Sequence, residues 1–263
     1  MKQFAIFGNP VAHSKSPLMH NLAFKKLGFE GCYGRWLIED GNELRDTFFR
    51  LGLSGCNITV PHKEFAFEAA DVVEPFAKEV RAVNTLILKD GKLYGYNTDA
   101  PGFYRALQKL GSVQSALIMG AGGTARALAL YLRTQKIDIE VVNRSAKRLQ
   151  WFNDEGFTCH TWDSFTPSSY DVVINTTSAG LTDESLPMPK ELLDRALENT
   201  QYAVDVIYGK ETPFLKEAKR LNLPLFDGSE MLLQQGIIAF DYFTDHRYTL
   251  DEIEQAMRPF LSL

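Results

Sequence analysis

Polar side chains that could bind and protonate a substrate gather in three short stretches of the first hundred residues, each following a predicted strand. The stretches are residues 9–17, 57–63 and 96–99, and Asn84 lies near the third in sequence. Together they supply hydroxyls, amides, one ammonium group and one carboxylate. Because ligands bind at strand ends in open α/β sheets, these stretches predict a site for a small acid that carries several hydroxyl groups.

Each of these residues also has an ordinary structural interpretation. Ser16 is well placed to cap a helix whose first residue is Pro17, and Asp99 could cap the next one. Thr59 could be a plain strand-end residue, and a single lysine such as Lys63 is usually solvated. Only their joint occurrence in loops beside a second, nucleotide-binding half of the chain favours a functional interpretation.

A glycine-rich turn in the second half predicts dinucleotide binding. An apolar run ends at Gly120, Gly122 follows, and a helical pattern begins at once. In this strand–turn–helix context the first glycine permits the tight turn and the second lets the backbone approach a pyrophosphate. Ala125 stands where a third small residue allows close helix–strand packing. The N–H groups at the helix start would then face the phosphates.

The end of the next strand indicates which dinucleotide binds. Residues 138–142 form the strand, and Asn143 and Arg144 follow it, with Arg148 close behind. NAD-binding versions place an acidic residue here to bind the ribose 2′-hydroxyl. A guanidinium instead favours a 2′-phosphate, so the sequence predicts NADP. The alternative is a simple Asn-Arg turn that Ser145 caps.

Composition excludes several classes of protein. The chain has 263 residues, of which 45% are hydrophobic and 23% charged, and its net charge is −5. These values are typical of a globular protein with one or two domains, and they argue against nucleic-acid binding. We find no signal peptide and no apolar run that could span a membrane. Three isolated cysteines show no metal-ligand spacing and suggest small buried residues in a reducing cytoplasm.

The pattern of elements predicts an α/β protein with two domains. Strand and helix patterns alternate in the first hundred residues and end in a hairpin around Asp90-Gly91. The second half predicts a doubly wound parallel sheet of Rossmann type, because its short Val/Ile-rich runs suit strands that are buried on both faces. We therefore expect a substrate-binding and catalytic domain in residues 1–100, completed by helices in residues 237–263. A dinucleotide-binding domain would occupy residues 101–236.

The whole chain resembles the shikimate dehydrogenases. The matching stretches are residues 8–21 (GNPVAHSKSPLMHN), 55–63 (GCNITVPHK), 82–85 (AVNT), 95–99 (GYNTD), 120–123 (GAGG), 143–145 (NRS) and 175–178 (NTTS), together with Gln235. Members of this family reduce 3-dehydroshikimate to shikimate with NADPH, a late step toward chorismate and the aromatic amino acids. The segment after Asp205 departs from the family pattern, since it is one residue shorter after Tyr208 and lacks an Asn-Pro pair.

The resemblance implies a role for each matched residue. Lys63 would be the acid/base group, paired with Asp99. The substrate would be held by Ser14, Ser16, Thr59, Lys63, Asn84, Asp99, Tyr208 and Gln235. NADP would be held by Gly120, Ala121, Gly122, Gly123, Thr124, Asn143, Arg144, Ser145, Arg148, Thr176, Val206 and Gly228. Gln234 is a second candidate for the glutamine position, and Gln235 fits the flanking pattern better.

Three other functions compete with this one. A related dehydrogenase could accept quinate or use NAD, and nothing in the sequence decides between these substrates. A non-catalytic sensor of shikimate and nucleotide would lack Lys63 or Asp99, or would carry a DNA-binding segment, and neither is the case. The length leaves no room for a fused second enzyme. We expect no metal, no nucleic acid and no membrane partner, and a cytoplasmic monomer or homodimer.

Overall fold

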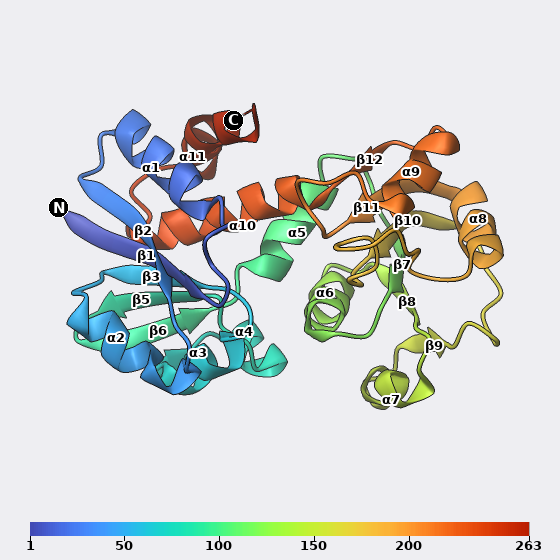
Figure 1. The fold of residues 1–263 in the computed structure, drawn as a ribbon, viewed down its shortest axis with the longest axis horizontal. Helices are drawn as coiled ribbons and strands as arrows, with labels where there is room; N and C mark the ends of the chain where they lie inside the picture. The colour runs from blue at the N-terminus through green and yellow to red at the C-terminus, as the bar shows by residue number, and fades with distance from the viewer. Residues whose placement is uncertain (263) are drawn as a thin grey trace. The chain divides into compact units, whose positions relative to one another are not determined.

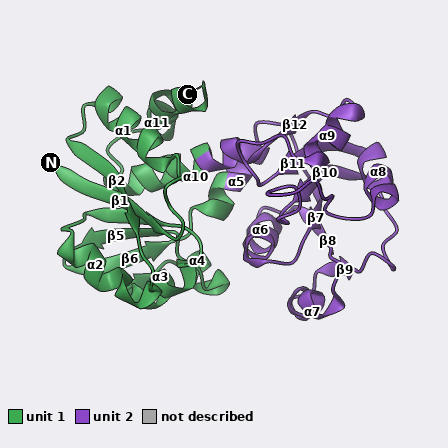
Figure 2. Ribbon diagram, in the orientation of Figure 1, with its two compact units in different colours: residues 1–102, 233–263 green, residues 103–232 purple. Residues whose placement is uncertain are grey.

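The computed structural model describes residues 1–262, which form two compact units (Figure 2). Unit 1 contains Met1–Gly102 and the chain from Leu233 onward, and unit 2 contains Phe103–Leu232. The second crossing thus lies before the expected boundary at residue 237, and Gln235 belongs to unit 1. At this point two backbones approach each other closely, because a Cβ at Gly102 would lie 2.5 Å from the Gln235 amide nitrogen.

Unit 1 is built on a mixed six-stranded sheet with the order β2-β1-β3-β5-β6-β4 (Figure 1). Strands β1, β2 and β3 are parallel, whereas β5 is antiparallel to both β3 and β6. The first residue of β5 therefore lies at the same end of the sheet as the last residues of β1, β3 and β6. The strands are β1 (Lys2–Gly8), β2 (Gly31–Leu37), β3 (Gly55–Ile58), β4 (Val72–Val73), β5 (Thr85–Lys89) and β6 (Lys92–Tyr96).

Helices cover both faces of this sheet because successive residues of β1 point to opposite sides. Phe7 packs in one cluster with Phe48, Ala66 and Ala77 of α2, α3 and α4, whereas the Phe4 ring lies 4.6 Å from Phe243 of α10. Helices α1 and α11 lie side by side (Figure 1). The helices are α1 (Ser16–Leu27), α2 (Leu44–Arg50), α3 (Lys63–Ala69), α4 (Pro75–Val80), α10 (Gly228–Phe243) and α11 (Leu250–Met257), with 3-10 turns at Gly41–Glu43 and Arg258–Ser262.

The expected capping role of Ser16 is wrong. Helix α1 already begins at Ser16, and the N-cap position belongs to Lys15, whose side chain makes no capping bond. The Ser16 amide instead donates to the Ser14 hydroxyl oxygen at 3.3 Å. Ser14 therefore satisfies one of the backbone N–H groups that a helix start leaves without an intrahelical acceptor. Ser145, at the N-cap of α7, likewise makes no side-chain capping bond.

Unit 2 confirms the predicted doubly wound parallel sheet. Its strand order is β12-β11-β10-β7-β8-β9, and every pair is parallel. The strands are β7 (Ser115–Met119), β8 (Asp138–Val142), β9 (Thr158–His160), β10 (Tyr170–Asn175), β11 (Thr200–Asp205) and β12 (Leu225–Phe226). The helices are α5 (Asp99–Leu107), α6 (Gly123–Thr134), α7 (Ala146–Asp154), α8 (Lys190–Glu198) and α9 (Pro213–Arg220), of which α5 begins in unit 1.

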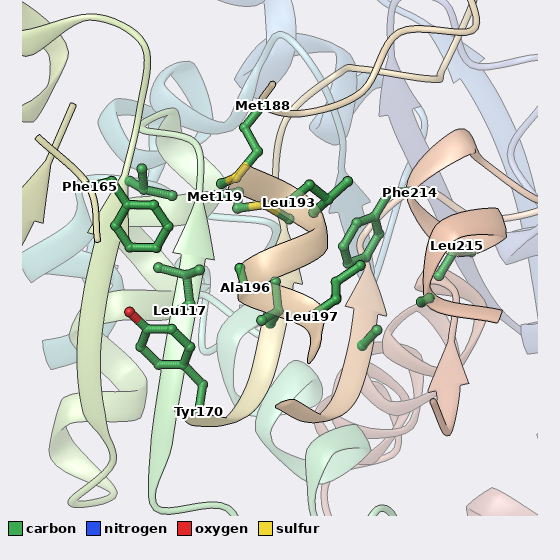
Figure 3. Close-up of a cluster of buried hydrophobic side chains, with 14 residues drawn as sticks. Leu117, Met119, Phe165, Tyr170, Met188, Leu193, Ala196, Leu197, Phe214 and Leu215 are labelled. Atoms are coloured by element: carbon green, nitrogen blue, oxygen red, sulfur yellow. The ribbon is translucent and has the colours of Figure 1, made fainter. Parts of the chain in front are cut away.

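One face of this sheet forms a large apolar core (Figure 3). Leu117 and Met119 of β7 meet Leu193 and Leu197 of α8, and Phe214 of α9 completes the cluster. All five side chains are almost completely buried. Burying a side chain of this size contributes roughly 1.5–3 kcal/mol. The core therefore fixes the strands whose carboxyl ends carry the candidate cofactor residues.

Residues 1–262 contain neither a membrane-spanning helix nor a cluster of metal ligands, and their three cysteines are free. No helix in this range is long and apolar enough to cross a membrane, and no cluster of three or more His, Cys, Asp or Glu side chains in it could hold a metal. Of the three free cysteines, Cys56 is fully buried as expected. Cys32 and Cys159 are only partly buried, since each lies on an outer strand of its sheet.

Candidate active site

Lys63 and Asp99 form an ion pair in unit 1. The Lys63 Nζ donates to Asp99 Oδ2 at 2.6 Å, so the two residues that the family resemblance pairs are in hydrogen-bond contact. The two side chains are 31% and 20% exposed, so water and small molecules can reach them. A partly exposed ammonium that a carboxylate holds in place can deliver a proton to a bound oxygen atom.

The backbone around the pair explains its position. Lys63 is the first residue of α3 and Asp99 is the first residue of α5. The Val83 amide donates to the Lys63 carbonyl at 3.0 Å, which ties α3 to the chain that enters β5. The Asp99 amide donates to Asn97 Oδ1 at 3.1 Å, and Asn97 Nδ2 in turn donates to the Ala82 carbonyl at 3.0 Å. The backbones of Lys63 and Asp99 are thus both anchored to the segment Ala82-Val83.

Ser14 lies in the loop between β1 and α1, Ser16 is the first residue of α1, and both are buried. Sequence reasoning missed the residue that holds this loop. Arg35, on β2, donates to the Ser14 carbonyl from Nε at 3.0 Å and from its terminal nitrogen at 2.6 Å. This two-pronged contact places a positive charge at the Ser14 carbonyl, within the stretch that carries both serines. Nothing about a lone arginine in an edge strand signals this role in the sequence.

Thr59 lies directly after β3 and is partly buried. Its amide donates to the Phe7 carbonyl at 2.8 Å, and its carbonyl accepts from the His62 amide at 3.0 Å. Gly8 is needed beside it, because any Cβ at Gly8 would overlap the Thr59 methyl group. The close approach of these two strand ends brings Thr59 toward the β1 loop.

Asn84 and Gln235 are both buried in unit 1 and are linked through Thr98. Asn84 Nδ2 donates to the Thr98 hydroxyl oxygen at 3.0 Å, and the Thr98 hydroxyl donates to Gln235 Oε1 at 3.4 Å. Thr98 itself was missed, although it stands immediately before Asp99. Gln235 and Asn84 therefore share one hydrogen-bonded cluster with the residues that flank the ion pair.

Unit 2 contains a cavity of about 470 Å³ at the carboxyl ends of β7, β8 and β10. This volume lies within the usual range of roughly 300–1,000 Å³ for small-molecule sites. Seven of the residues predicted to bind the cofactor line it, namely Gly120, Ala121, Gly122, Asn143, Arg144, Arg148 and Thr176. The glycine turn and the basic strand end therefore meet in one cavity.

The glycine turn has the backbone geometry that cofactor binding needs. Gly120 adopts a φ of +114°, and a Cβ there would lie 2.6 Å from Thr176 Oγ1. Thr176 Oγ1 itself donates to the Met119 carbonyl at 2.7 Å. At Gly122 no atom lies within 4 Å of a Cβ position, so the backbone there is open to a ligand. Helix α6 begins at the next residue and directs its first N–H groups toward this space.

Arg144 and Arg148 give the cavity a basic wall. The Arg144 guanidinium lies 6.0 Å from the centre of the Trp162 ring, which also lines the cavity. Two guanidinium groups and an aromatic ring suit a phosphate and a flat base. The remaining lining was missed from sequence; it consists of Val142, Trp162, Thr177, Ser178, Ala179, Asp183, Ser185, Leu186 and Pro187. Most of it comes from the irregular segment after β10, in which only the NTTS stretch at residues 175–178 matched the family.

Five of the predicted cofactor residues do not line this cavity; they are Gly123, Thr124, Ser145, Val206 and Gly228. Val206 and Gly228 pack against each other, since a Cβ at Gly228 would overlap the Val206 carbonyl. Val206 directly follows β11, which ends at Asp205. Tyr208 belongs to unit 2 as well, and burial raises the pKa of its hydroxyl.

Asp205 organises the loops next to Val206 and was not predicted. It is fully buried and accepts hydrogen bonds from Asn175 Nδ2 at 3.0 Å, the Thr212 hydroxyl at 2.6 Å and the Ile207 amide at 3.0 Å. Burial raises the pKa of this carboxyl group, and the three donors act in the opposite direction. Asp205 thereby joins the ends of β10 and β11. A strand-ending aspartate is too common in α/β proteins to reveal this role.

Comparisons with known proteins agree along nearly the whole chain. A family model for the shikimate dehydrogenase substrate binding domain matches residues 6–86. An NADP(+) shikimate dehydrogenase of Helicobacter hepaticus is 46% identical over 253 residues, which cover 95% of this chain and 94% of that protein. The corresponding protein of Bacillus mycoides is 35% identical, with 97% of each chain covered.

A solved structure gives the same result. Shikimate 5-dehydrogenase from Thermus thermophilus, in complex with NADP(H) and shikimate, superposes with a TM-score of 0.86 at 36% identity, and 99% of this chain and 100% of that chain are covered. Sequence and fold thus agree over the two units and not only over one motif. The chain therefore belongs to the shikimate dehydrogenase family.

Proposed function

We propose that this protein catalyses the reversible, NADPH-dependent reduction of 3-dehydroshikimate to shikimate, in the route to chorismate and the aromatic amino acids. The observation that carries the proposal is the Lys63–Asp99 ion pair, with 2.6 Å between Nζ and Oδ2, in the unit that carries the serine loop and the buried amides. The relatives named as NADP(+) shikimate dehydrogenases support the substrate and the cofactor.

The reaction needs a proton donor at the substrate oxygen. When bound, NADPH supplies a hydride to the ketone carbon. Lys63 then donates a proton from Nζ to the oxygen on that carbon, and its positive charge stabilises the negative charge that develops there. Asp99 accepts a hydrogen bond from Nζ and so holds the ammonium in place. In the oxidation of shikimate the same nitrogen takes up the hydroxyl proton.

The other residues of unit 1 bind the substrate in this proposal. The hydroxyls of Ser14 and Ser16 hold the carboxylate, and the Arg35 charge beside them favours an anion. Thr59, Asn84 and Gln235 hold the ring oxygens. The resemblance to the family also assigns Tyr208 to the carboxylate.

The residues of the unit 2 cavity fit an NADP molecule. Arg144 and Arg148 supply two positive charges for a 2′-phosphate, and the Trp162 ring supplies a flat surface for the base. The open backbone at Gly122 and the first N–H groups of α6 suit the pyrophosphate. No carboxylate follows β8 to bind a ribose 2′-hydroxyl, since Asn143 stands there.

Initial rates of cofactor reduction test the proposal. The purified protein is assayed with shikimate or quinate, each combined with NADP or NAD, and we expect the highest kcat/KM for shikimate with NADP. Comparable rates with quinate would establish the broader quinate/shikimate activity instead. Absence of reduction in all four combinations would refute the enzymatic function.

A further inference from the structure

A buried hydrogen-bond chain runs from the core of unit 1 to Asn84. It links Tyr33, Asn57, Thr85, Asn84 and Thr98, all of them at most 4% exposed. The first link is a bond from the Tyr33 hydroxyl to Asn57 Oδ1 at 2.6 Å. The last is the bond from Asn84 Nδ2 to the Thr98 hydroxyl oxygen at 3.0 Å. Asn57, Thr85, Asn84 and Thr98 lie at or next to the ends of β3, β5 and β6 from which the chain leads to Lys63 and Asp99.

Backbone groups fix the direction of each hydrogen bond in this chain. Asn57 Nδ2 faces the Asn84 carbonyl at 3.4 Å, and a carbonyl only accepts, so Asn57 Oδ1 must face the Tyr33 hydroxyl. Burial raises the pKa of that hydroxyl, which therefore keeps its proton and donates it. Asn57 Nδ2 also donates to the Thr85 hydroxyl oxygen at 3.0 Å. The Thr85 hydroxyl donates its single proton to Asn84 Oδ1 at 3.1 Å, since its other neighbour, the Thr98 hydroxyl oxygen, is farther away at 3.4 Å.

The other end of the chain fixes Asn84 in the same orientation. The Thr98 backbone amide can only donate, and it lies 2.8 Å from Asn84 Oδ1. With the Thr85 hydroxyl as the second donor, both lone pairs of Oδ1 are occupied. Asn84 can therefore offer a ligand only the second proton of its Nδ2. An oxygen atom with a lone pair is the partner that such a group selects.

We propose that Tyr33, Asn57 and Thr85 are positioning residues that make Asn84 an obligatory donor to a substrate oxygen. The proposal rests on the proposed function, because it assumes that Asn84 contacts the ring oxygens of shikimate. A ketone oxygen can only accept, and a hydroxyl that accepts from Asn84 can still donate its own proton to the Asp99 carboxylate. The polarised chain thus favours substrates with an oxygen at this position over analogues that carry an ammonium group there.

Double-mutant cycles with Thr85→Val and Asn84→Ala test the proposal. Valine keeps the shape of Thr85 but removes the hydroxyl group and with it the hydrogen bonds to Asn57, Asn84 and Thr98. For shikimate oxidation with saturating NADP, we expect Thr85→Val to raise KM for shikimate about tenfold, the equivalent of one lost hydrogen bond. We expect kcat and KM for NADP to change less than about threefold. Thr85→Ser, which keeps the hydroxyl, should restore a KM within about twofold of the wild-type value.

The effect should vanish in the Asn84→Ala background, because Thr85 acts through Asn84. An equal rise in KM in both backgrounds, or no rise in either, would overturn the proposal. If Thr85→Val does not fold, Tyr33→Phe is judged by the same comparison. Thr47→Val is the matched control, since Thr47 is a buried threonine on α2 whose hydroxyl oxygen accepts from Arg50 at 3.1 Å. Wild-type protein without activity on shikimate would refute the proposed function instead.

Discussion

Replacing Lys63 by methionine tests the acid/base assignment most directly. Methionine keeps an unbranched stem of similar length and removes the ammonium, so the substrate loses its proton donor while the loop keeps most of its packing. General acid–base groups contribute about 10²–10⁴-fold to rate. We therefore expect kcat to fall by this factor, which corresponds to about 2.7–5.4 kcal/mol of barrier. The KM for shikimate should change less than about tenfold.

The stability of the variant should stay near that of the wild type. The two partners are 31% and 20% exposed, and exposed ion pairs contribute only about 0.2–1 kcal/mol. Urea unfolding should therefore show a loss of about 1 kcal/mol or less, far below the catalytic effect. A large loss of activity with a small loss of stability identifies a chemical role.

Steady-state kinetics in both directions provide the assay, with Lys78→Met as the control, since Lys78 is an exposed lysine on α4 of the same unit. Asp99→Asn should cost less than Lys63→Met, because an amide oxygen still accepts a hydrogen bond from Nζ. The double variant should be no slower than Lys63→Met alone, because the two residues act as one unit. A Lys63→Met enzyme that keeps kcat within about threefold of the wild type would refute the assignment.

Three further predictions concern the cofactor site and the core. Arg144→Ala should raise KM for NADP about tenfold or more and leave KM for NAD nearly unchanged, since a charge-assisted phosphate contact contributes about 1.5–3 kcal/mol. The kinetic control is Arg126→Ala, because Arg126 lies over the Trp151 ring and does not line the cavity. Equal weakening of NADP and NAD binding would contradict the phosphate contact. Gly120→Ala should lose about 1–3 kcal/mol of unfolding free energy and bind NADP more weakly in a fluorescence titration, because Gly120 has a φ of +114° and a Cβ there would lie 2.6 Å from Thr176 Oγ1. Gly123→Ala, whose Cβ would stand in open space, should be close to the wild type in stability. Equal stabilities of the two variants would argue against strain at Gly120. His20 is fully buried, its ring is stacked on that of Tyr33 at 4.4 Å between centroids, and burial lowers its pKa to about 3, so below pH 6.5 the unfolded chain binds a proton that the folded chain does not. Urea unfolding at pH 7 and pH 5 should therefore show that the wild type loses about 2 kcal/mol more unfolding free energy on acidification than His20→Phe does. Equal losses in the two proteins would show that His20 takes up its proton without unfolding.

Local signals in the sequence determined the architecture of both units. Strands and helices followed from the apolar runs and from glycine and proline, because these depend on neighbours within a few residues. The turn at Gly120 and the basic strand end at Arg144 predicted the cofactor half of the site for the same reason. The start of α1 was misjudged by one residue, since Ser14 rather than Ser16 accepts the hydrogen bond at the helix start.

Tertiary structure decided the groupings that depend on distant parts of the chain. Lys63 and Asp99 are 36 residues apart, and only the antiparallel placement of β5 between β3 and β6 brings their loops to one sheet edge. Gln235 likewise packs against Gly102, a residue far away in the sequence, and both belong to unit 1.

Supporting residues such as Arg35, Asp205 and Thr85 could not be read from the sequence at all. Each acts by a hydrogen bond across the fold, from a side chain to a backbone group or to another side chain. The formation of such a bond depends on distances of a few tenths of an ångström and on the direction of its proton, which residue types and spacing do not encode. The sequence thus identified the chemical groups, and the packing of the chain decided which of them are held together and which way their protons point.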